Sequence, residues 1–157
     1  MKVAIFDFDG TLTTRETLPC LGKDWIRQKR SRIRYFRTLF SVLPHLVLWK
    51  TGKLSREHMK MRVMHRFNRI FTGMTEEEIM AFFAHAYPNL KKFFNPAVIE
   101  EIKAAKNEGF YTVLLSGAHA VLLRFVGEDL GFDCVIGVEL PLCNGIFDHS
   151  RPVEFID

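Results

Sequence analysis

The stretch that decides the fold is residues 2–13, which read Lys-Val-Ala-Ile-Phe-Asp-Phe-Asp-Gly-Thr-Leu-Thr. Residues 3–6 form an apolar run that is short enough for a buried parallel strand. Asp7 and Asp9 come where this run stops, and Gly10 breaks it. Ligands of open α/β sheets bind beyond the carboxyl ends of the strands, and side chains two residues apart on a strand point the same way. The sequence therefore predicts two carboxylates side by side at the ligand-binding edge of a sheet.

Two neighbouring carboxylates need a compensating charge. Like charges at this distance repel each other unless a cation or a shared proton intervenes. Mg²⁺ is the cation that fits best, because it takes carboxylate and phosphate oxygens. The alternative is a turn with two solvated aspartates, which the position directly after an apolar strand disfavours. We therefore expect Asp7 and Asp9 to hold Mg²⁺.

The bulk properties are those of an ordinary globular protein. The chain has 157 residues, 48% hydrophobic and 25% charged, enough for one domain or for a small core with an inserted piece. The three cysteines are far apart and form no Cys-x-x-Cys motif, which argues against a disulfide framework or a zinc site. No apolar run approaches the roughly 18 residues of a membrane span, and the first one is too short for a signal peptide. We expect a cytoplasmic protein.

The middle of the chain is predicted to be helical. After Thr13 the pattern becomes helical and stays so until about Pro88. Within it, Thr75-Glu76-Glu77-Glu78 is a capping box that begins a helix. We interpret residues 14–94 as a helical insert that divides an α/β core into residues 1–13 and 95–157.

A basic and apolar block occupies the first half of this insert, from Lys23 to Trp49. Seven basic residues lie between Lys23 and Arg37, against the single acid Asp24. Apolar residues follow at spacings of three and four, which predicts one helix face, and a proline is expected to kink or split that helix. These residues are Ile33, Phe36, Phe40, Leu43 and Val47, with the proline at Pro44.

Two interpretations of the Lys23–Trp49 block are open. In the favoured one, the apolar face packs inside the insert and the arginines are solvated. In the other, the block lies on an anionic membrane surface as a peripheral contact. Nucleic-acid binding is not expected, because no stacking or groove-reading module accompanies the basic residues.

The second piece of the core begins at Asn95-Pro96, a helix N-cap followed by proline at the first helical position. A buried strand at residues 110–115 ends at Ser116-Gly117, and a helix is predicted to follow directly. Residues 134–136 form a short third strand, and Asn144-Gly145 predicts a type I′ hairpin. This order of strands and helices indicates a three-layer α/β core with an incomplete parallel sheet.

The Ser116-Gly117 turn is the second candidate for chemistry. A hydroxyl at the carboxyl end of a strand, followed by a helix start, makes an anion site because free N–H groups point outward there. Alone, the pattern is as compatible with a plain N-cap. A position about a hundred residues after the Asp7 motif, beyond a helical insert, favours the anion site.

Residues 7–13, Asp-Phe-Asp-Gly-Thr-Leu-Thr, resemble the nucleophile motif of the haloacid dehalogenase superfamily of phosphatases. The resemblance implies a Rossmann-like core with a helical cap and Mg²⁺ as cofactor. It also implies that Asp7 becomes an aspartyl-phosphate and that Asp9 acts as general acid and then general base. Gly10 and Thr11 belong to the same phosphate-binding motif, while Ser116 and Gly117 match the second motif, which holds the phosphoryl group.

Within the superfamily, the sequence is most similar to the phosphoserine-phosphatase-like subgroup (subfamily IB). Glu16 stands at the offset from Asp7 where those enzymes place a glutamate that reads the substrate, although a solvated helix residue would look the same. Arg62, downstream of Gly52-Lys53-Leu54, is a weaker candidate for a substrate carboxylate, since its spacing slips by one residue. The resemblance implies a small phosphorylated substrate. His119 is expected on an exposed helix turn.

Two of the superfamily's four motifs have no counterpart in the sequence. No lysine follows Lys106, and Asp148, Glu154 and Asp157 do not form an acidic metal loop after a strand. We therefore expect a truncated piece of a longer phosphatase. Two alternatives stay open: a lipid-phosphate phosphatase working at a membrane surface, and a catalytically incomplete module that binds phosphate or a partner.

Overall fold

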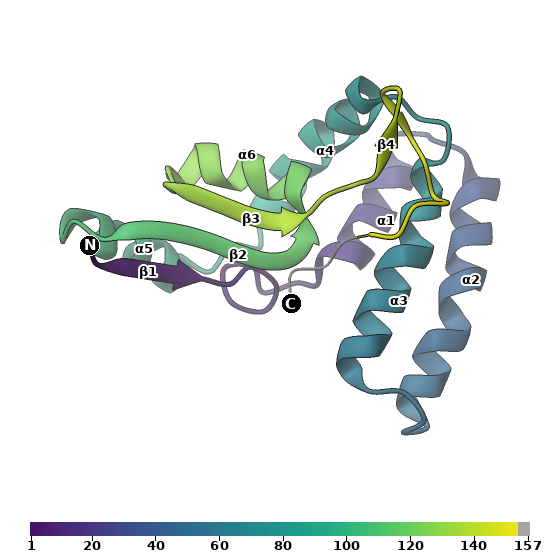
Figure 1. The fold of residues 1–157 in the computed structure, drawn as a ribbon, viewed down its shortest axis with the longest axis horizontal. Helices are drawn as coiled ribbons and strands as arrows, with labels where there is room; N and C mark the ends of the chain where they lie inside the picture. The colour runs from purple at the N-terminus through teal and green to yellow at the C-terminus, as the bar shows by residue number, and fades with distance from the viewer. Residues whose placement is uncertain (154–157) are drawn as a thin grey trace.

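The structure is a computed structural model that describes residues 1–153 (Figure 1). Two groups of elements follow each other along the chain. In chain order they are β1 (Val3–Phe6), α1 (Thr17–Arg27), α2 (Arg32–Lys50), α3 (Arg56–Asn68), the short 3₁₀ helix η1 (Arg69–Phe71), α4 (Glu76–Lys91), α5 (Pro96–Asn107), β2 (Tyr111–His119), α6 (Ala120–Leu130), β3 (Cys134–Val138), β4 (Leu142–Cys143) and β5 (Ile146–Phe147). The mixed α/β class expected from the sequence is confirmed.

The core is a parallel sheet of three strands in the order β1-β2-β3. Phe6 pairs with Leu114 and Val113 with Cys134, so segments more than a hundred residues apart share one sheet. Helices α5 and α6 pack on β2, and Leu114 is fully buried beneath them. The opposite face is apolar and open among the described residues, where Ile5 is 65% exposed.

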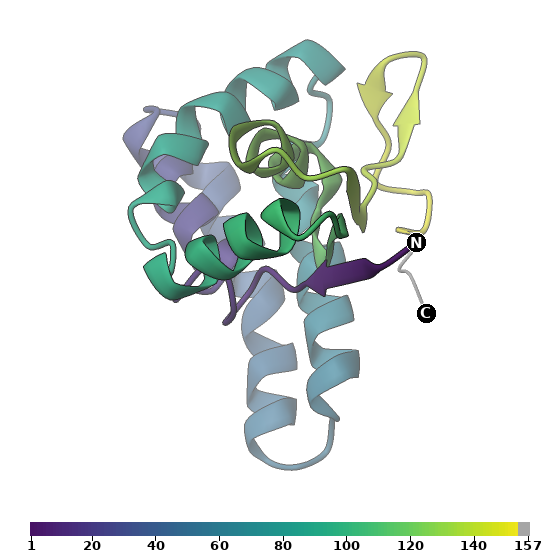
Figure 2. The same cartoon turned by 90° about the vertical axis from the view of Figure 1, so that its left-hand side faces the viewer.

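The helical insert leaves the core and returns to it at one point. The backbone N–H of Thr14 donates to the carbonyl of Phe93 at 2.9 Å, and that of Asn95 donates to the carbonyl of Leu12 at 2.8 Å. These bonds tie residues 12–14 to residues 93–95. The division of the chain into an α/β core and a helical insert stays a prediction. From there, the hairpin of α2 and α3 extends away from the sheet (Figure 2).

The local start signals hold in the structure. At α4, the side chain of Thr75 accepts from the N–H of Glu78, and the side chain of Glu78 accepts from the N–H of Thr75, so the capping box is confirmed. Asn95 caps α5 by accepting from the N–H of Ala97. Asn144 and its neighbouring glycine both have positive φ angles, 52° and 76°, as a type I′ turn between β4 and β5 demands.

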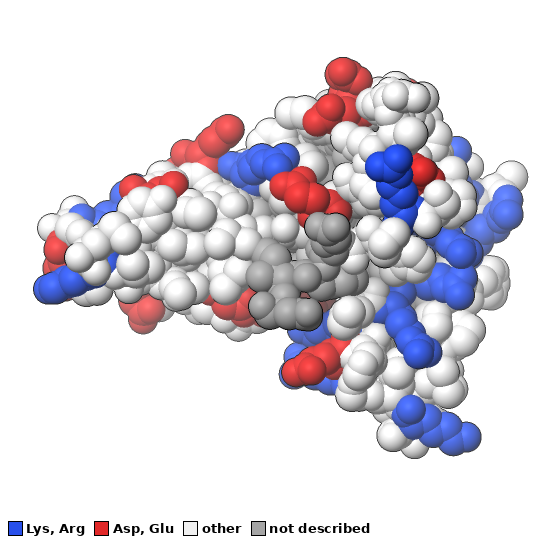
Figure 3. Space-filling model, in the orientation of Figure 1, with Lys and Arg blue, Asp and Glu red and all other residues white. Residues whose placement is uncertain are grey.

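The predicted packing of the α2 apolar face is wrong. Ile33 and Phe40 are 75% and 68% exposed, while the side of α2 that meets α3 buries Thr38 and Val42. Pro44 lies inside a helix that continues to Lys50, so it does not split α2. Helical spacing defines a face but not what covers it. Lys and Arg side chains lie along the edge that α2 forms (Figure 3). Among residues 1–153, no helix is long and apolar enough to cross a membrane.

His119 ties the insert to the core. It is fully buried at the end of β2, not on the exposed helix turn that the sequence suggested, because the strand runs on and the helix begins at Ala120. Its Nε2 lies 2.6 Å from Oδ1 of Asn68, the last residue of α3. The rings of Phe71 and Phe83 pack against the imidazole. One hydrophobic cluster therefore spans both parts of the chain.

Burial of His119 predicts a pH-dependent loss of stability. Desolvation lowers the pKa of His119 to about 3, against an ordinary value of 6.5. Below pH 6.5, His119 therefore binds a proton in the unfolded chain but not in the folded chain, so the free energy of unfolding falls as the pH drops. The slope is about 1.4 kcal/mol per pH unit, or roughly 2 kcal/mol by pH 5. Urea unfolding of the wild type and of His119→Gln at several pH values between 7 and 5 measures it.

Between pH 6.5 and 5, the free energy of unfolding of His119→Gln should depend on pH less steeply than that of the wild type, by about 1.4 kcal/mol per pH unit. His85, which is exposed on α4, provides the matched control. His85→Gln should leave the slope unchanged. Equal slopes in the wild type and His119→Gln would contradict a neutral, buried imidazole.

Candidate active site

The loop after β1 presents Asp7 and holds Asp9. Phe8, between them, is fully buried and anchors the loop, while Asp7 is exposed and Asp9 half-buried. The hydroxyl of Thr11 donates to Oδ2 of Asp7 at 3.2 Å, and no donor among residues 1–153 engages the other oxygen of that carboxylate. Gly10 closes the loop with a φ of 82°, in the left-handed region that glycine adopts readily.

Asp9 is held by the start of α1. Its Oδ1 accepts from the backbone N–H of Thr17 at 3.0 Å and also from the Thr17 hydroxyl. Glu16, the residue at the N-cap position, makes no side-chain cap, so Asp9 takes that role from eight residues away. Burial raises the pKa of Asp9, and the charge of Glu16 adds to the rise, while the Thr17 hydroxyl opposes it. The protonated carboxyl is thereby favoured, as a proton donor requires.

Ser116 lies within β2, just beyond the residues that pair with β1. Because Phe6 pairs with Leu114 in a parallel register, Asp7 and Ser116 lie at the same end of this strand pair. Ser116 is 9% exposed, and its Oγ accepts from the N–H of Ala118 at 3.2 Å. A Cβ on Gly117 would meet no atom within 4 Å, so the space above this turn is open.

The expected helix start at Ser116-Gly117 is wrong. β2 runs to His119, and α6 begins at Ala120. The pairing of β2 with β3 shifts register between Leu115 and His119, so the Ser116 turn is an irregularity within the strand. Such irregularities re-aim side chains next to sites. Any anion at this turn would meet local backbone and the Ser116 side chain, not the N-terminus of α6.

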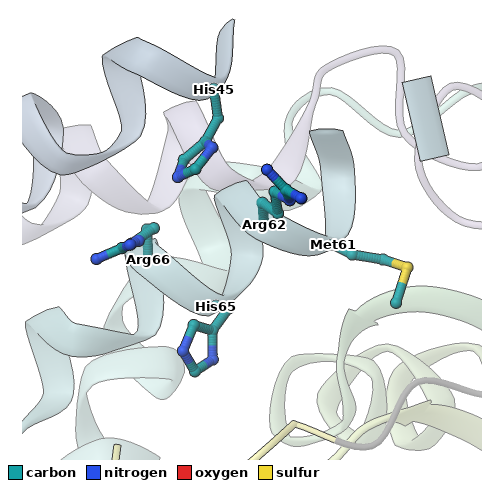
Figure 4. A pocket seen from close by; sticks show the side chains of 5 residues that line it. All are labelled: His45, Met61, Arg62, His65 and Arg66. Atoms are coloured by element: carbon teal, nitrogen blue, oxygen red, sulfur yellow. The ribbon is translucent and has the colours of Figure 1, made fainter. Parts of the chain in front are cut away.

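Arg62 and the aspartates are not brought into one pocket. Arg62 lines a hollow of about 300 Å³ between α2 and α3, together with His45, His65, Arg66 and Met61 (Figure 4). His45 descends from α2 toward the arginines of α3, whose charges, after burial, help to lower its pKa. The structure gives no support to a contact between Arg62 and a ligand at Asp7.

Two neighbours of Asp9 were not predicted from the sequence. Thr17 supplies both hydrogen bonds to its carboxylate, although a threonine at the first turn of a helix is too common to attract attention. Lys60, on α3, lies near enough for its charge to lower the pKa of Asp9 slightly. Glu16 also acts on Asp9 through its charge, and its predicted contact with a substrate stays a prediction.

The donors present fit Mg²⁺ in its usual manner. Mg²⁺ is commonly held by one or two carboxylates, with phosphate and water oxygens completing the octahedron. Asp7 offers an exposed carboxylate with one unengaged oxygen, beside Asp9. Among residues 1–153 no group of three or more His, Cys, Asp or Glu side chains could hold an ion, and Glu154 and Asp157 lie outside the described residues.

The chain belongs to the haloacid dehalogenase-like hydrolase family, which matches it over residues 4–156. A protein of unknown function from Bordetella pertussis Tohama I has a similar structure, with a TM-score of 0.76, 13% identity, and coverage of 98% of this chain and 66% of that one. A phosphoserine phosphohydrolase-like protein from Francisella tularensis gives a TM-score of 0.60, 24% identity, and coverage of 98% and 65%.

Phosphoserine phosphatase, solved as a phospho-aspartyl intermediate analogue, is also similar. Its TM-score is 0.56, with 20% identity and coverage of 94% of this chain and 61% of that one. The chain thus spans about two thirds or less of the length of these proteins. At such identities the likeness concerns the fold. A sequence comparison with curated proteins finds no match.

Removing the Thr17 hydroxyl should raise the pKa of Asp9. The hydroxyl donates to the carboxylate and so stabilises its charged form, which Thr17→Val would lose while keeping the backbone N–H bond. Carbon NMR of the Asp9 carboxyl during a pH titration measures the shift. Thr14→Val is the control, because Thr14 donates to the carbonyl of Phe93 instead. An Asp9 pKa that moves equally in both variants would contradict the contact.

Proposed function

We propose that the chain carries the nucleophile and acid-base carboxylates of a Mg²⁺-dependent phosphomonoester hydrolase that works through an aspartyl-phosphate. The observation that carries the proposal is the contrast between two carboxylates two residues apart. Asp7 is exposed and steadied by one hydroxyl, whereas Asp9 is half-buried with a raised pKa. Different environments for neighbouring carboxylates are how enzymes assign a nucleophile and an acid.

In the proposed first step, an oxygen of Asp7 attacks phosphorus, and the bond from phosphorus to the substrate oxygen breaks. The leaving oxygen takes the proton of Asp9, so that no free alkoxide is released. Thr11 orients Asp7 by its hydrogen bond, and Thr17 orients Asp9. The Ser116 hydroxyl and the Gly117 N–H would donate to the phosphoryl oxygens.

In the second step, Asp9 accepts a proton from water, which attacks phosphorus and releases inorganic phosphate from Asp7. Mg²⁺ would be held by the carboxylate of Asp7 and the backbone carbonyl of Asp9, and would neutralise phosphoryl charge. The helical insert would limit access of water to the site.

The proposed substrate is a small phosphorylated metabolite, of the kind that phosphoserine represents. Glu16 and Lys60 are the charged neighbours of Asp9 on the side of the insert. Glu16 would bind an amine of the substrate, and Lys60 would bind an anionic group of the substrate. The compartment belongs to the same proposal: Cys20, Cys134 and Cys143 are free thiols, which suits a reducing cytoplasm.

The competing function is a module that binds phosphate without turnover. The observation behind it is that, among residues 1–153, no group of three or more His, Cys, Asp or Glu side chains could hold a metal ion. Binding of phosphate needs only the Ser116 turn, whereas turnover needs Asp7. Substitution of Asp7 therefore separates the two functions.

Asp7→Asn should abolish hydrolysis of p-nitrophenyl phosphate in the presence of Mg²⁺. An amide is a poor nucleophile and carries no charge for the ion, so a loss of about a thousandfold or more is expected. Phosphate release measures it, with Glu100→Gln, an exposed residue on α5, as the control. Full activity in Asp7→Asn would reject the mechanism. Phosphate binding by a wild type without turnover would favour the binding module.

Asp9→Asn should slow the second step more than the first. The p-nitrophenolate leaving group needs little acid assistance, but the attacking water still needs a base. A phosphorylated enzyme is expected to accumulate, with a burst of product followed by slow turnover. Intact-protein mass spectrometry after quenching detects the adduct, and peptide mapping should place it on Asp7. A slow variant without burst or adduct would contradict this assignment of roles.

A further inference from the structure

An apolar stripe on α2 has no cover among residues 1–153. We call Ile33, Phe36, Phe40, Leu43 and Val47 the α2 stripe. Their exposed fractions are 75%, 50%, 68%, 41% and 57%. The spacing of three, four, three and four places all five on one side of the helix, opposite the side that packs on α3. Large apolar side chains exposed in a continuous row mark interaction surfaces more often than single exposed ones do.

The stripe lies on a projecting, convex part of the molecule. The α2–α3 hairpin extends away from the sheet in both views (Figures 1 and 2). α2 contacts α1, α3 and η1 but has no comparable contact with the sheet. A surface helix with its apolar side outward fits a flat or concave partner.

The charges around the stripe have one sign. Eight Lys and Arg residues lie between Trp25 and Arg56, and no Asp or Glu does. On α2 itself, Arg32, Arg37 and Lys50 flank the stripe, and none of them forms an ion pair in the part of the chain that the structure describes. The surface around the stripe is therefore complementary to negative charge.

A cationic groove adjoins the N-terminal end of the stripe at Ile33. Its volume is about 560 Å³, and Arg37, Arg69 and His149 line it together with the hydroxyls of Ser41 and Thr72. Arg34 shapes its wall by donating to the backbone carbonyls of Ile70 and Thr72 at 3.2 and 3.0 Å. Arginine and hydroxyl donors are the groups that bind phosphate oxygens.

We propose that this face docks on a membrane surface that contains anionic phospholipids. The α2 stripe would lie in the plane of the interface, the flanking Arg and Lys side chains would meet headgroup phosphates, and the groove would receive one headgroup. The contact is peripheral, and it does not depend on the phosphatase activity proposed above.

The charges disfavour the two protein alternatives. A second copy of the chain, paired stripe to stripe, would set Arg32 and Arg37 of each copy near Lys50 of the other or near each other, with no acid between them. An acidic helix from another protein would suit the charges. However, helices usually dock in grooves, and the stripe is a convex ridge.

Sedimentation with vesicles tests the proposal. Vesicles of phosphatidylcholine alone and of phosphatidylcholine with phosphatidylserine are compared at about 0.1 M salt. We expect binding to the phosphatidylserine vesicles to be at least tenfold tighter and to weaken as salt rises. The stripe variant Phe40→Trp should show a larger blue shift of tryptophan emission on binding than the wild type, in which Trp25 is 2% exposed and Trp49 lies on the side of α2 opposite the stripe.

Two variants divide the apolar and charged contributions. Phe36→Ser with Phe40→Ser should lower the binding of the protein to phosphatidylserine vesicles at least tenfold at every salt concentration. Arg32→Gln with Arg37→Gln and Lys50→Gln should lower it about a hundredfold at low salt, at roughly fivefold per basic residue, and flatten the salt dependence.

Matched controls come from other surfaces. Met80 and Ile146 are 49% and 45% exposed but lie on α4 and β5, so their double substitution by serine should leave binding unchanged. Lys92→Gln with Lys103→Gln is the charge control. Circular dichroism confirms that each variant folds.

Three results would overturn the proposal. The first is no binding of the folded wild type to phosphatidylserine vesicles. The second is an equal loss of binding in the control variants. The third is a dimer that dissociates in the Phe36→Ser and Phe40→Ser variant while neither protein binds vesicles, because the stripe would then be an interface between two copies.

Discussion

The parallel pairing of β1 with β2 is the constraint on which the rest of the structure depends. It sets Phe6 beside Leu114, so that Asp7 and Ser116 lie at the same end of the two paired strands. A register slip of one residue would turn these side chains to the other face of the sheet. The long insert is possible only because its two ends are themselves hydrogen-bonded near Leu12 and Phe94.

Features set by adjacent residues could be predicted from the sequence. The strand before Asp7, the capping box of α4, the Asn95 cap and the Asn144-Gly145 turn each depend on a few neighbouring side chains and backbone angles. Such local preferences survive folding because tertiary contacts agree with them. The two aspartates could be found for the same reason: the chemistry and the turn share one short motif.

Features set by distant contacts could not be predicted. Because β2 pairs with β3, the strand continues beyond Ser116 and His119 becomes buried. The residues near His119 in the sequence predict neither the longer strand nor the burial. The α2 stripe has a helical period whether another helix, a membrane or solvent lies over it. Thr17 and Lys60 approach Asp9 only after α1 and α3 have packed, so their relation to the site is a property of the fold.

The bond between His119 and Asn68 has a consequence for access to the aspartates. It lies inside a cluster of phenylalanine rings that joins both parts of the chain, and α4 packs on α6 nearby. A rigid-body movement of the whole insert away from the core would expose these rings and break the hydrogen bond between the buried side chains of His119 and Asn68. The distal turns of α2 and α3 carry no such cost, since neither helix packs extensively on a strand of the sheet. Entry and exit of small molecules are therefore expected to depend on bending of that hairpin, while its base stays fixed.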